Sequence, residues 1–192
     1  MKKSIIWIVI IVFIALWGVN AYNNIVSQEE NVTKAWGNVE NQYQRRADLI
    51  PNLVNTVKGY AAHESETLQA VVEARAKATS ISLNAESMTP EQLQEFQEAQ
   101  NQVTGALGRL IAVSESYPDL KANENFKELQ SQLEGTENRI AVERKSFNDA
   151  VKEYNANIRR FPKNLLANIF GFDRKPYFEA EAGSEKAPTV EF

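Results

Sequence analysis

The feature that most constrains this chain is an apolar, charge-free stretch close to its N-terminus. From Ser4 to Gln28 no residue carries a charge, and the core of the stretch, Ile5 to Leu16, consists of Ile, Val, Trp, Phe, Ala and Leu. As an α-helix the stretch would be about 37 Å long, enough to cross a hydrocarbon core of about 30 Å. We therefore predict one membrane-spanning helix, over residues 4–24, that holds the protein in the lipid.

The residues that flank this span predict its orientation. Lys2 and Lys3 place positive charge on the short N-terminal side, whereas the first charge beyond the span is acidic, at Glu29. Positively charged flanks tend to stay in the cytoplasm. We therefore expect residues 1–3 to be cytoplasmic and the chain beyond about Tyr22 to be extracytoplasmic.

The same stretch also fits a cleaved signal peptide. Two lysines precede the apolar core, and Val19-Asn20-Ala21 has small residues where a peptidase could cut. However, the apolar stretch is long for a signal core, and Tyr22, Ile25 and Val26 continue it. We favour a retained anchor, and the intact mass of the purified protein distinguishes the two possibilities.

The composition excludes several classes of function. The chain has 21 basic and 25 acidic residues, and two of the basic ones precede the span, so the exported part is net negative and predicts no binding of nucleic acid. The chain has no cysteine, which excludes thiol catalysis, haem attachment and zinc–thiolate sites. The exported part is long enough for one domain, and helix packing rather than disulfides must stabilise it.

Beyond the span, apolar residues recur at alternating intervals of three and four residues, the pattern of long helices that pack along one face. A first repeat covers Val32–Ala78 without a change of phase. A second helix begins at Thr89–Gln92, with a capping Thr, a Pro in the first turn and a Gln three residues after the cap, and ends at Pro118. A third covers Glu124–Arg160. The sequence therefore predicts an all-α protein with an elongated antiparallel helical bundle over residues 25–160.

Pro51 lies inside the first repeat and leaves two architectures open. We interpret it as a bend, because it lies off the apolar seam, where water can replace the hydrogen bond that the carbonyl of Ala47 loses. The bundle then has three long helices. If the chain instead reverses near Asp48 to Pro51, with Asp48 as the cap, the bundle has four helices of similar length.

The three-helix interpretation predicts self-association. Its first helix would extend about 80 Å beyond the membrane and its second only about 42 Å, so the second would reach back only to the level of Pro51. A membrane-proximal apolar stripe would then have no partner within the chain, and such a stripe favours a homo-oligomer. The stripe residues are Ile25, Val32, Trp36, Val39 and Tyr43.

Charged residues on the seam predict a polar core. Arg46 and Glu64 both occupy seam positions, where a buried polar residue can fix the helix register at a cost in stability. Arg46, together with Arg45 and Asp48, could also bind an anionic ligand or a lipid headgroup, but we prefer salt bridges within the bundle. Counting along the helices places Glu64 within about one turn of Arg109, which predicts a buried pair.

The chain after Arg160 predicts an amphipathic segment over residues 161–182 and a flexible tail over 183–192. We prefer to interpret the segment as a hydrophobic cap over one end of the bundle, with contact to the membrane or to a partner protein as the alternative. Three exported helices would place Phe161 far from the membrane, and four would return it to the membrane surface. The apolar residues in question are Phe161, Leu165, Leu166, Ile169, Phe170 and Phe172.

No pattern of residues predicts catalysis. His63 is the only histidine, and the zinc-protease pattern needs a second one where Thr67 stands. Ser114 and Ser116 have no histidine nearby in the sequence to activate them, and the paired glutamates show no sign of a pocket. We therefore expect no enzyme activity, no catalytic residues, no cofactor and no metal.

Several short strings are distributed over nearly the whole chain: Ala35-Trp36, Arg45–Val54, Val57–Tyr60, Glu64, Ala74–Ala76, Tyr117–Ala122, Leu133–Ile140, Tyr154-Asn155 and Phe170–Phe172. In these strings the chain resembles the LemA family of membrane-anchored bacterial proteins. This resemblance implies a single N-terminal helix in the bacterial cytoplasmic membrane, a helical-bundle domain, and relatives with membrane-linked functions, including magnetosome formation. It brings no catalytic mechanism.

Taken together, these features predict a non-catalytic single-pass membrane protein whose exported bundle is a scaffold or self-assembly module. One alternative is an adaptor that recruits a membrane enzyme or protease through residues 161–178. Another is a polymer of such rods that remodels the membrane.

Overall fold

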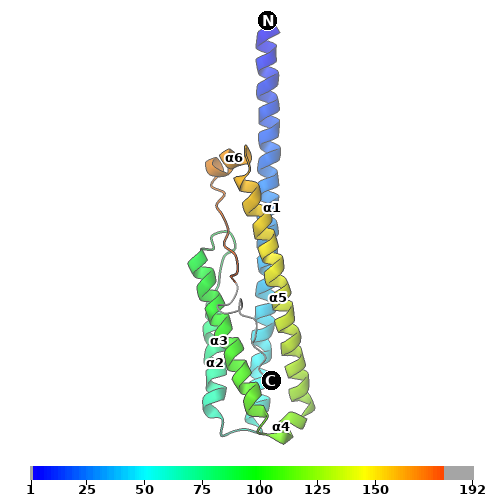
Figure 1. The fold of residues 1–192 in the computed structure, drawn as a ribbon, viewed down its shortest axis with the longest axis vertical. Helices are drawn as coiled ribbons and strands as arrows, with labels where there is room; N and C mark the ends of the chain where they lie inside the picture. Colours follow the sequence, from blue (N-terminus) through cyan, green and yellow to red (C-terminus); the bar gives the residue numbers. More distant parts are fainter. Residues whose placement is uncertain (1, 180–192) are drawn as a thin grey trace, which may run out of the picture.

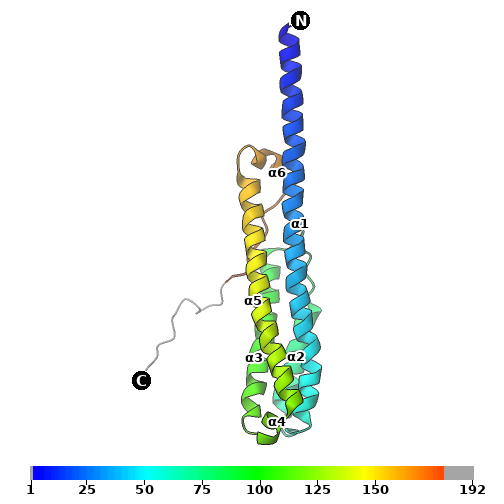
Figure 2. The same cartoon turned by 90° about the vertical axis from the view of Figure 1, so that its right-hand side faces the viewer.

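The structure is a computed structural model that describes residues 2–179, with side chains from Ile5 onward. Within these residues it consists of six α-helices and contains no strand, which confirms the predicted all-α class (Figures 1 and 2). The helices are α1 (Lys2–Lys58), α2 (Ser65–Ser80), α3 (Pro90–Ser114), α4 (Pro118–Ala122), α5 (Glu124–Arg159) and α6 (Lys163–Phe170).

α1 contains both the predicted span and the first part of the bundle. Its first third projects alone beyond the other helices (Figure 1), and its large apolar side chains from Ile5 to Val19 are exposed. The first buried side chains along α1 are those of Ala21, which is 4% exposed, and Ile25, which is fully buried. Among the described residues, α1 is the one helix long and apolar enough to cross a membrane.

The chain reverses at a position that neither predicted architecture contains. α1 continues through Pro51, as the bend interpretation predicts, but it ends at Lys58 rather than near residue 80. Gly59 starts the turn, and the backbone N–H groups of Tyr60 and Ala61 both donate to the carbonyl of Val57, at 3.0 and 2.8 Å. The apolar repeat continues in phase across this turn, so periodicity alone could not reveal it.

The carbonyl oxygen of Ala47, to which Pro51 cannot donate a backbone hydrogen bond, accepts one from a side chain instead. Arg75 on α2 donates from its Nε to the carbonyl oxygen of Ala47 at 2.7 Å. The charged partner therefore replaces the backbone N–H that a proline lacks. This bond explains how α1 passes through Pro51 without ending.

The boundaries of α3 and α5 agree closely with the sequence pattern. Thr89 and Gln92 form a reciprocal capping box, in which each side chain accepts from the other residue's backbone N–H. Asn123 caps α5 by accepting from the backbone N–H of Phe126 at 3.0 Å. The short helix α4 joins the two (Figure 2).

The four principal helices run alternately away from and toward the span, as in an antiparallel bundle (Figures 1 and 2). α1 and α5 lie side by side along the whole rod, whereas α2 and α3 form a shorter pair confined to its distal part. The core accordingly divides into two clusters, a distal one around Leu53 and Leu110 and a membrane-proximal one around Trp36 and Phe147.

The prediction that the apolar stripe lacks a partner is wrong. Ile25, Val32, Trp36, Val39 and Tyr43 are all buried within the chain, in the membrane-proximal cluster. Because the chain reverses after Lys58, α5 runs back toward the span, and its 36 residues extend about 54 Å, far enough to cover the stripe. These five side chains are thus core residues of the monomer, and the argument for self-association through them no longer holds.

Candidate functional site

A polar layer crosses the middle of the bundle at Arg46. Its side chain is 2% exposed and donates to the Glu137 carboxylate at 2.6 Å and to Gln100 Oε1 at 2.6 Å. It also donates to Thr104 Oγ1 at 2.9 Å. The structure thus places this predicted register residue in the core, with an acidic partner on α5 that the sequence analysis did not assign to it.

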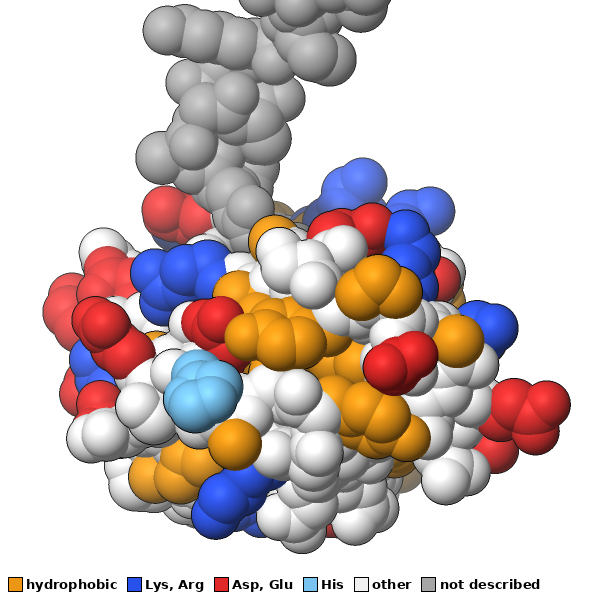
Figure 3. Space-filling view, turned by 90° about the horizontal axis from the view of Figure 1, so that it is seen from below, with side chains coloured by type: hydrophobic (Ala, Val, Ile, Leu, Met, Phe, Trp, Pro, Cys, Tyr) orange, Lys and Arg blue, Asp and Glu red, His pale blue; other side chains and the backbone are white. Residues whose placement is uncertain are grey.

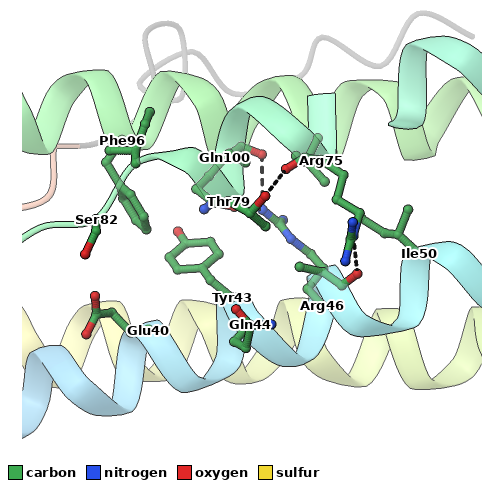
Figure 4. Close-up of a pocket in the computed structure, with 14 residues that line it drawn as sticks. Glu40, Tyr43, Gln44, Arg46, Ile50, Arg75, Thr79, Ser82, Phe96 and Gln100 are labelled. Carbon is green, nitrogen blue, oxygen red and sulfur yellow. Dashed lines mark hydrogen bonds between the residues drawn. The ribbon is translucent and has the colours of Figure 1, made fainter. Parts of the chain in front are cut away.

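A small cavity of about 190 Å³ lies beside this layer, between α1, α2 and α3 (Figure 4). In Figure 4, Arg46 reaches toward Gln100, and Arg75 reaches toward α1. Burial raises the pKa of Glu40 at the edge of the cavity, and burial also raises that of Tyr43, against the opposing charges of Arg144 and Arg46.

The two arginines beside this cavity are engaged within the bundle. Both already donate to fixed oxygens of the bundle, and the Glu40 carboxylate opposes the binding of an anion. No His or Cys is among the described residues that line the cavity, so a Ser–His or Cys–His pair is not present there. Among the described residues, no group of three or more His, Cys, Asp and Glu side chains could hold a metal ion.

The predicted pair of Glu64 and Arg109 does not form. Glu64 lies just before α2, at the distal turn, and its carboxylate accepts from the Tyr117 hydroxyl at 2.9 Å. This hydrogen bond raises the pKa of Tyr117. Arg109 is exposed and lies opposite Glu73 and Ala74 instead. Because the chain turns after Lys58, Glu64 lies at the distal end of the bundle, whereas a helix continued to about residue 80 would place it part-way along the rod.

The distal end of the rod has a mixed surface. Viewed from that end, hydrophobic side chains form a central band with acidic and basic side chains around it (Figure 3). Tyr60 is 44% exposed here, and its hydroxyl accepts from Asn123 Nδ2 at 2.9 Å. His63 is exposed as well. This surface is the part of the bundle farthest from the span.

The opposite end, at the base of the span, brings the predicted C-terminal apolar residues together with α1. α5 returns to this level, so α6 lies across the membrane-proximal end of the bundle (Figures 1 and 2). The Tyr22 ring contacts Phe170 and Phe172, with ring centroids 5.0 and 5.6 Å apart. This position is the one expected for Phe161 in a bundle of four helices.

A polar clamp fixes α6 to the two long helices. Lys163 Nζ donates to Asn24 Oδ1 at 2.8 Å and to Asn157 Oδ1 at 2.6 Å. Asn157 Nδ2 in turn donates to Asn24 Oδ1 at 3.0 Å. Three polar residues, one from each of α1, α5 and α6, therefore set the height of α6 relative to the span.

From the sequence, we interpret the C-terminal segment as a hydrophobic cap. This interpretation describes the residues after α6 better than it describes Phe161 and α6 themselves. Residues 172–179, which we call the strap, run from α6 back along the bundle beside α5. Phe178 is buried in the membrane-proximal core, where its ring stacks on Trp36 and meets Phe147 edge to face, with centroids 6.0 and 5.5 Å apart. The strap thus covers the stripe together with α3, whose Phe96 ring meets Trp36 edge to face with centroids 5.4 Å apart.

Two asparagines on α5 hold the strap by its backbone. Asn155 Nδ2 donates to the carbonyl of Lys175, and its Oδ1 accepts the N–H of the same residue, at 2.9 and 3.0 Å. Asn148 makes the same pair of bonds with the backbone of Phe178, at 3.0 and 2.9 Å. Neither asparagine was assigned a role from the sequence, although their spacing of one heptad on a single helix face was a usable signal.

Lys175 closes the strap at its membrane-proximal end. Its ammonium group is buried and donates to the carboxylate of Glu29 at 2.8 Å and to the carbonyl of Glu86 at 2.6 Å. The neighbouring Tyr154 hydroxyl is buried and has no hydrogen-bond partner among the described residues. Burial, followed by the charge of Glu29, raises the pKa of Tyr154 strongly.

Comparison with known proteins agrees with this architecture. The model of the LemA family matches residues 35–192, which is most of the chain and nearly all of the part beyond the span. The chain belongs to the LemA family. The matched residues include most of the bundle, the polar layer around Arg46 and the strap.

Curated relatives of this LemA-family chain include magnetosome proteins. Magnetosome protein MamQ 2 of Paramagnetospirillum magneticum is 29% identical over 181 residues, which cover 85% of this chain and 66% of the relative. MamQ of Magnetospirillum gryphiswaldense is 33% identical, covering 84% of this chain and 66% of its own length. Protein LemA of Metamycoplasma hominis is 23% identical, covering 82% and 68%. The chain therefore spans just under two thirds of the length of the MamQ relatives.

Proposed function

We propose that this LemA-family protein is a non-catalytic, membrane-anchored scaffold that holds a helical rod on the extracytoplasmic side of the bacterial inner membrane. The observation that carries this proposal is the continuity of α1, which passes from the apolar stretch into the bundle core without a break. From Ala21 to Lys58 such a helix extends about 55 Å. The rod therefore carries its distal surface far from the lipid.

The use of polar groups supports a mechanical rather than a chemical role. The buried charges Arg46 and Lys175 each have an acidic partner within the bundle, Glu137 and Glu29. Such pairs fix the arrangement of helices. The naming of three relatives as magnetosome proteins supports a function connected with a membrane assembly.

The orientation is tested by labelling single cysteines from outside the cell. The chain has no native cysteine, so His63→Cys introduces one thiol at the exposed distal turn. We expect a membrane-impermeant maleimide to label this variant in spheroplasts without detergent. A cysteine added before Lys2 is the control and should react only after the membrane is permeabilised. The opposite pattern would overturn the extracytoplasmic placement.

The scaffold role is tested by photo-crosslinking in intact membranes. A benzophenone amino acid at Tyr60 should give adducts of discrete mass if the distal surface is where other proteins assemble. The matched controls are Val72 on α2 and Val142 on α5, which are 49% and 64% exposed on the sides of the rod. Equal adducts at all three positions, or none at Tyr60, would contradict a scaffold that presents its distal end.

A second candidate function is the adaptor, in which a membrane enzyme or protease binds the C-terminal apolar residues. The exposed apolar side chains of α6 favour it over an assembly of bare rods. A protein partner and lipid would compete for this surface, and quenching by labelled lipid distinguishes the two occupants.

A further inference from the structure

An exposed apolar face remains at the membrane-proximal end of the bundle. Ala167 is the one residue of α6 that is buried, whereas Phe161, Leu165, Ile169 and Phe170 are exposed, with 81% of Phe161 and 73% of Ile169 accessible. Large apolar side chains gathered in this way mark a surface that something covers. The place of this surface in the fold indicates what that is.

The height of α6 coincides with the end of the span. A hydrocarbon core of about 30 Å takes about 20 helical residues, so a span that begins at residue 4 leaves it near residue 24. α6 is fixed at that level, because Phe170 packs on Tyr22 and Lys163 donates to Asn24. Its exposed face therefore lies at the boundary between hydrocarbon and headgroups.

The apolar face of α6 is also continuous with the lipid-facing surface of α1. Trp17, Val19 and Tyr22 are exposed on the last turns of the span, and the contacts of Tyr22 join them to α6. A protein partner on α6 would have to share this surface with the lipid that surrounds α1. The lipid that already surrounds the span can cover both the apolar face of α6 and the exposed surface of α1, without a further partner.

The charges around α6 suit a bilayer surface. Arg159 and Arg160 are exposed immediately before it, and Arg174 and Asp173 follow it. The cations thus outnumber the one acidic group, at the level where headgroup phosphates lie. A short amphipathic helix with an apolar face and flanking cations is the usual form of an element that lies in the membrane interface.

We propose that Phe161 and α6 insert into the interface of the extracytoplasmic leaflet as a second membrane contact. The protein is then held by α1 through the bilayer and by α6 along its surface, and the clamp of Lys163 transmits the position of α6 to the bundle. This proposal rests on membrane anchoring by α1, but its test is independent of the labelling that tests the orientation of the rod.

The test places a fluorescent probe on α6 of the full-length protein in phosphatidylcholine vesicles. Ile169→Cys is labelled with an environment-sensitive dye, and the matched control is Val142→Cys, an exposed apolar position on the rod. We expect blue-shifted emission at position 169 and several-fold stronger quenching by doxyl-labelled lipid than at position 142. A tenfold dilution of the protein in the vesicles should leave both unchanged.

Three results would overturn the proposal. Water-like emission at position 169 would show that lipid does not cover the face. A blue shift without quenching by doxyl-labelled lipid would indicate contact with protein, and a shift lost on dilution would indicate a second copy.

In a second variant, Leu165→Glu should reverse the shift of the probe at position 169 while the helix content by circular dichroism stays unchanged. Retention of the shift would also count against insertion.

Discussion

At the scale of the residue, Pro51 and Arg75 act as a pair although they lie on different helices. We expect Arg75→Met to destabilise the protein by about 1 to 3 kcal/mol, because the nearly buried carbonyl of Ala47 would lose its donor. In a Pro51→Ala background the restored backbone N–H can satisfy that carbonyl, and the same change should cost about 1 kcal/mol less. Chemical unfolding of the four variants in detergent measures this coupling, and strict additivity would contradict it.

The buried Arg46 leads to a different kind of prediction. Glu137→Gln leaves its guanidinium in the core without a full counter-charge and should destabilise the bundle. Replacement of both residues, by Arg46→Met and Glu137→Leu, should cost less than the loss of Glu137 alone. Thermal unfolding followed by circular dichroism compares the three proteins. If the double variant is the least stable, the pair stabilises the fold outright.

The buried Tyr154 hydroxyl predicts sensitivity to alkali. Its pKa is raised by burial and by Glu29, so the folded chain keeps the proton at a pH where an unfolded tyrosine, with a pKa of about 10, loses it. Stability is therefore full below about pH 10 and falls as the pH rises further. Tyr154→Phe should make this fall less steep, and the exposed Tyr60→Phe is the control. Equal slopes for both variants in unfolding titrations would refute the assignment.

At the scale of the element, the strap depends on two side chains of α5. We expect Asn148→Ala combined with Asn155→Ala to release it, because four hydrogen bonds to the strap backbone are lost together. Trypsin should then cut after Arg174 several-fold faster than in the wild type. The exposed Asn138→Ala, also on α5, is the matched control. An unchanged cleavage rate would mean that Phe178 and Lys175 hold the strap without the two asparagines.

The sequence predicted individual helices better than the way they connect. The capping box at Thr89 identified the start of α3, because capping uses local residue types. The turn after Lys58 was missed, since the apolar repeat passes through Gly59 in phase and a single glycine also occurs within helices. The exposed face of α6 was anticipated as an alternative, whereas its height near Asn24 follows only from the fold.

The same limit applied to the polar pairs. Arg46 could be recognised as a core residue because it falls on the seam, yet its partner Glu137 is 91 residues away and no periodicity relates the two. The strap has no repeat to detect, because its backbone is extended and is held by side chains of another element. Long-range contacts of this kind depend on topology, which the misplaced turn had altered.

At the scale of the whole molecule, the burial of the stripe reverses the expected effect of mutating it. Trp36→Glu with Val39→Glu should unfold the membrane-proximal half of the rod rather than separate copies, since both side chains lie in its core. Hydrogen exchange should increase around Phe147 and the strap, and less around Leu110 in the distal cluster. A smaller mass by light scattering with unchanged exchange would instead support contact between copies.

Because α1 is one uninterrupted helix, a tilt of its membrane-spanning part displaces the distal end of the bundle sideways. Membrane helices tilt by about 20° on average, and over an arm of about 55 Å such a tilt moves the free end sideways by about 19 Å. Local thinning or thickening of the lipid changes this tilt. α1 is one continuous helix from the apolar stretch to Lys58. A change in bilayer thickness of a few ångströms would therefore displace the surface around Tyr60 sideways by a larger distance.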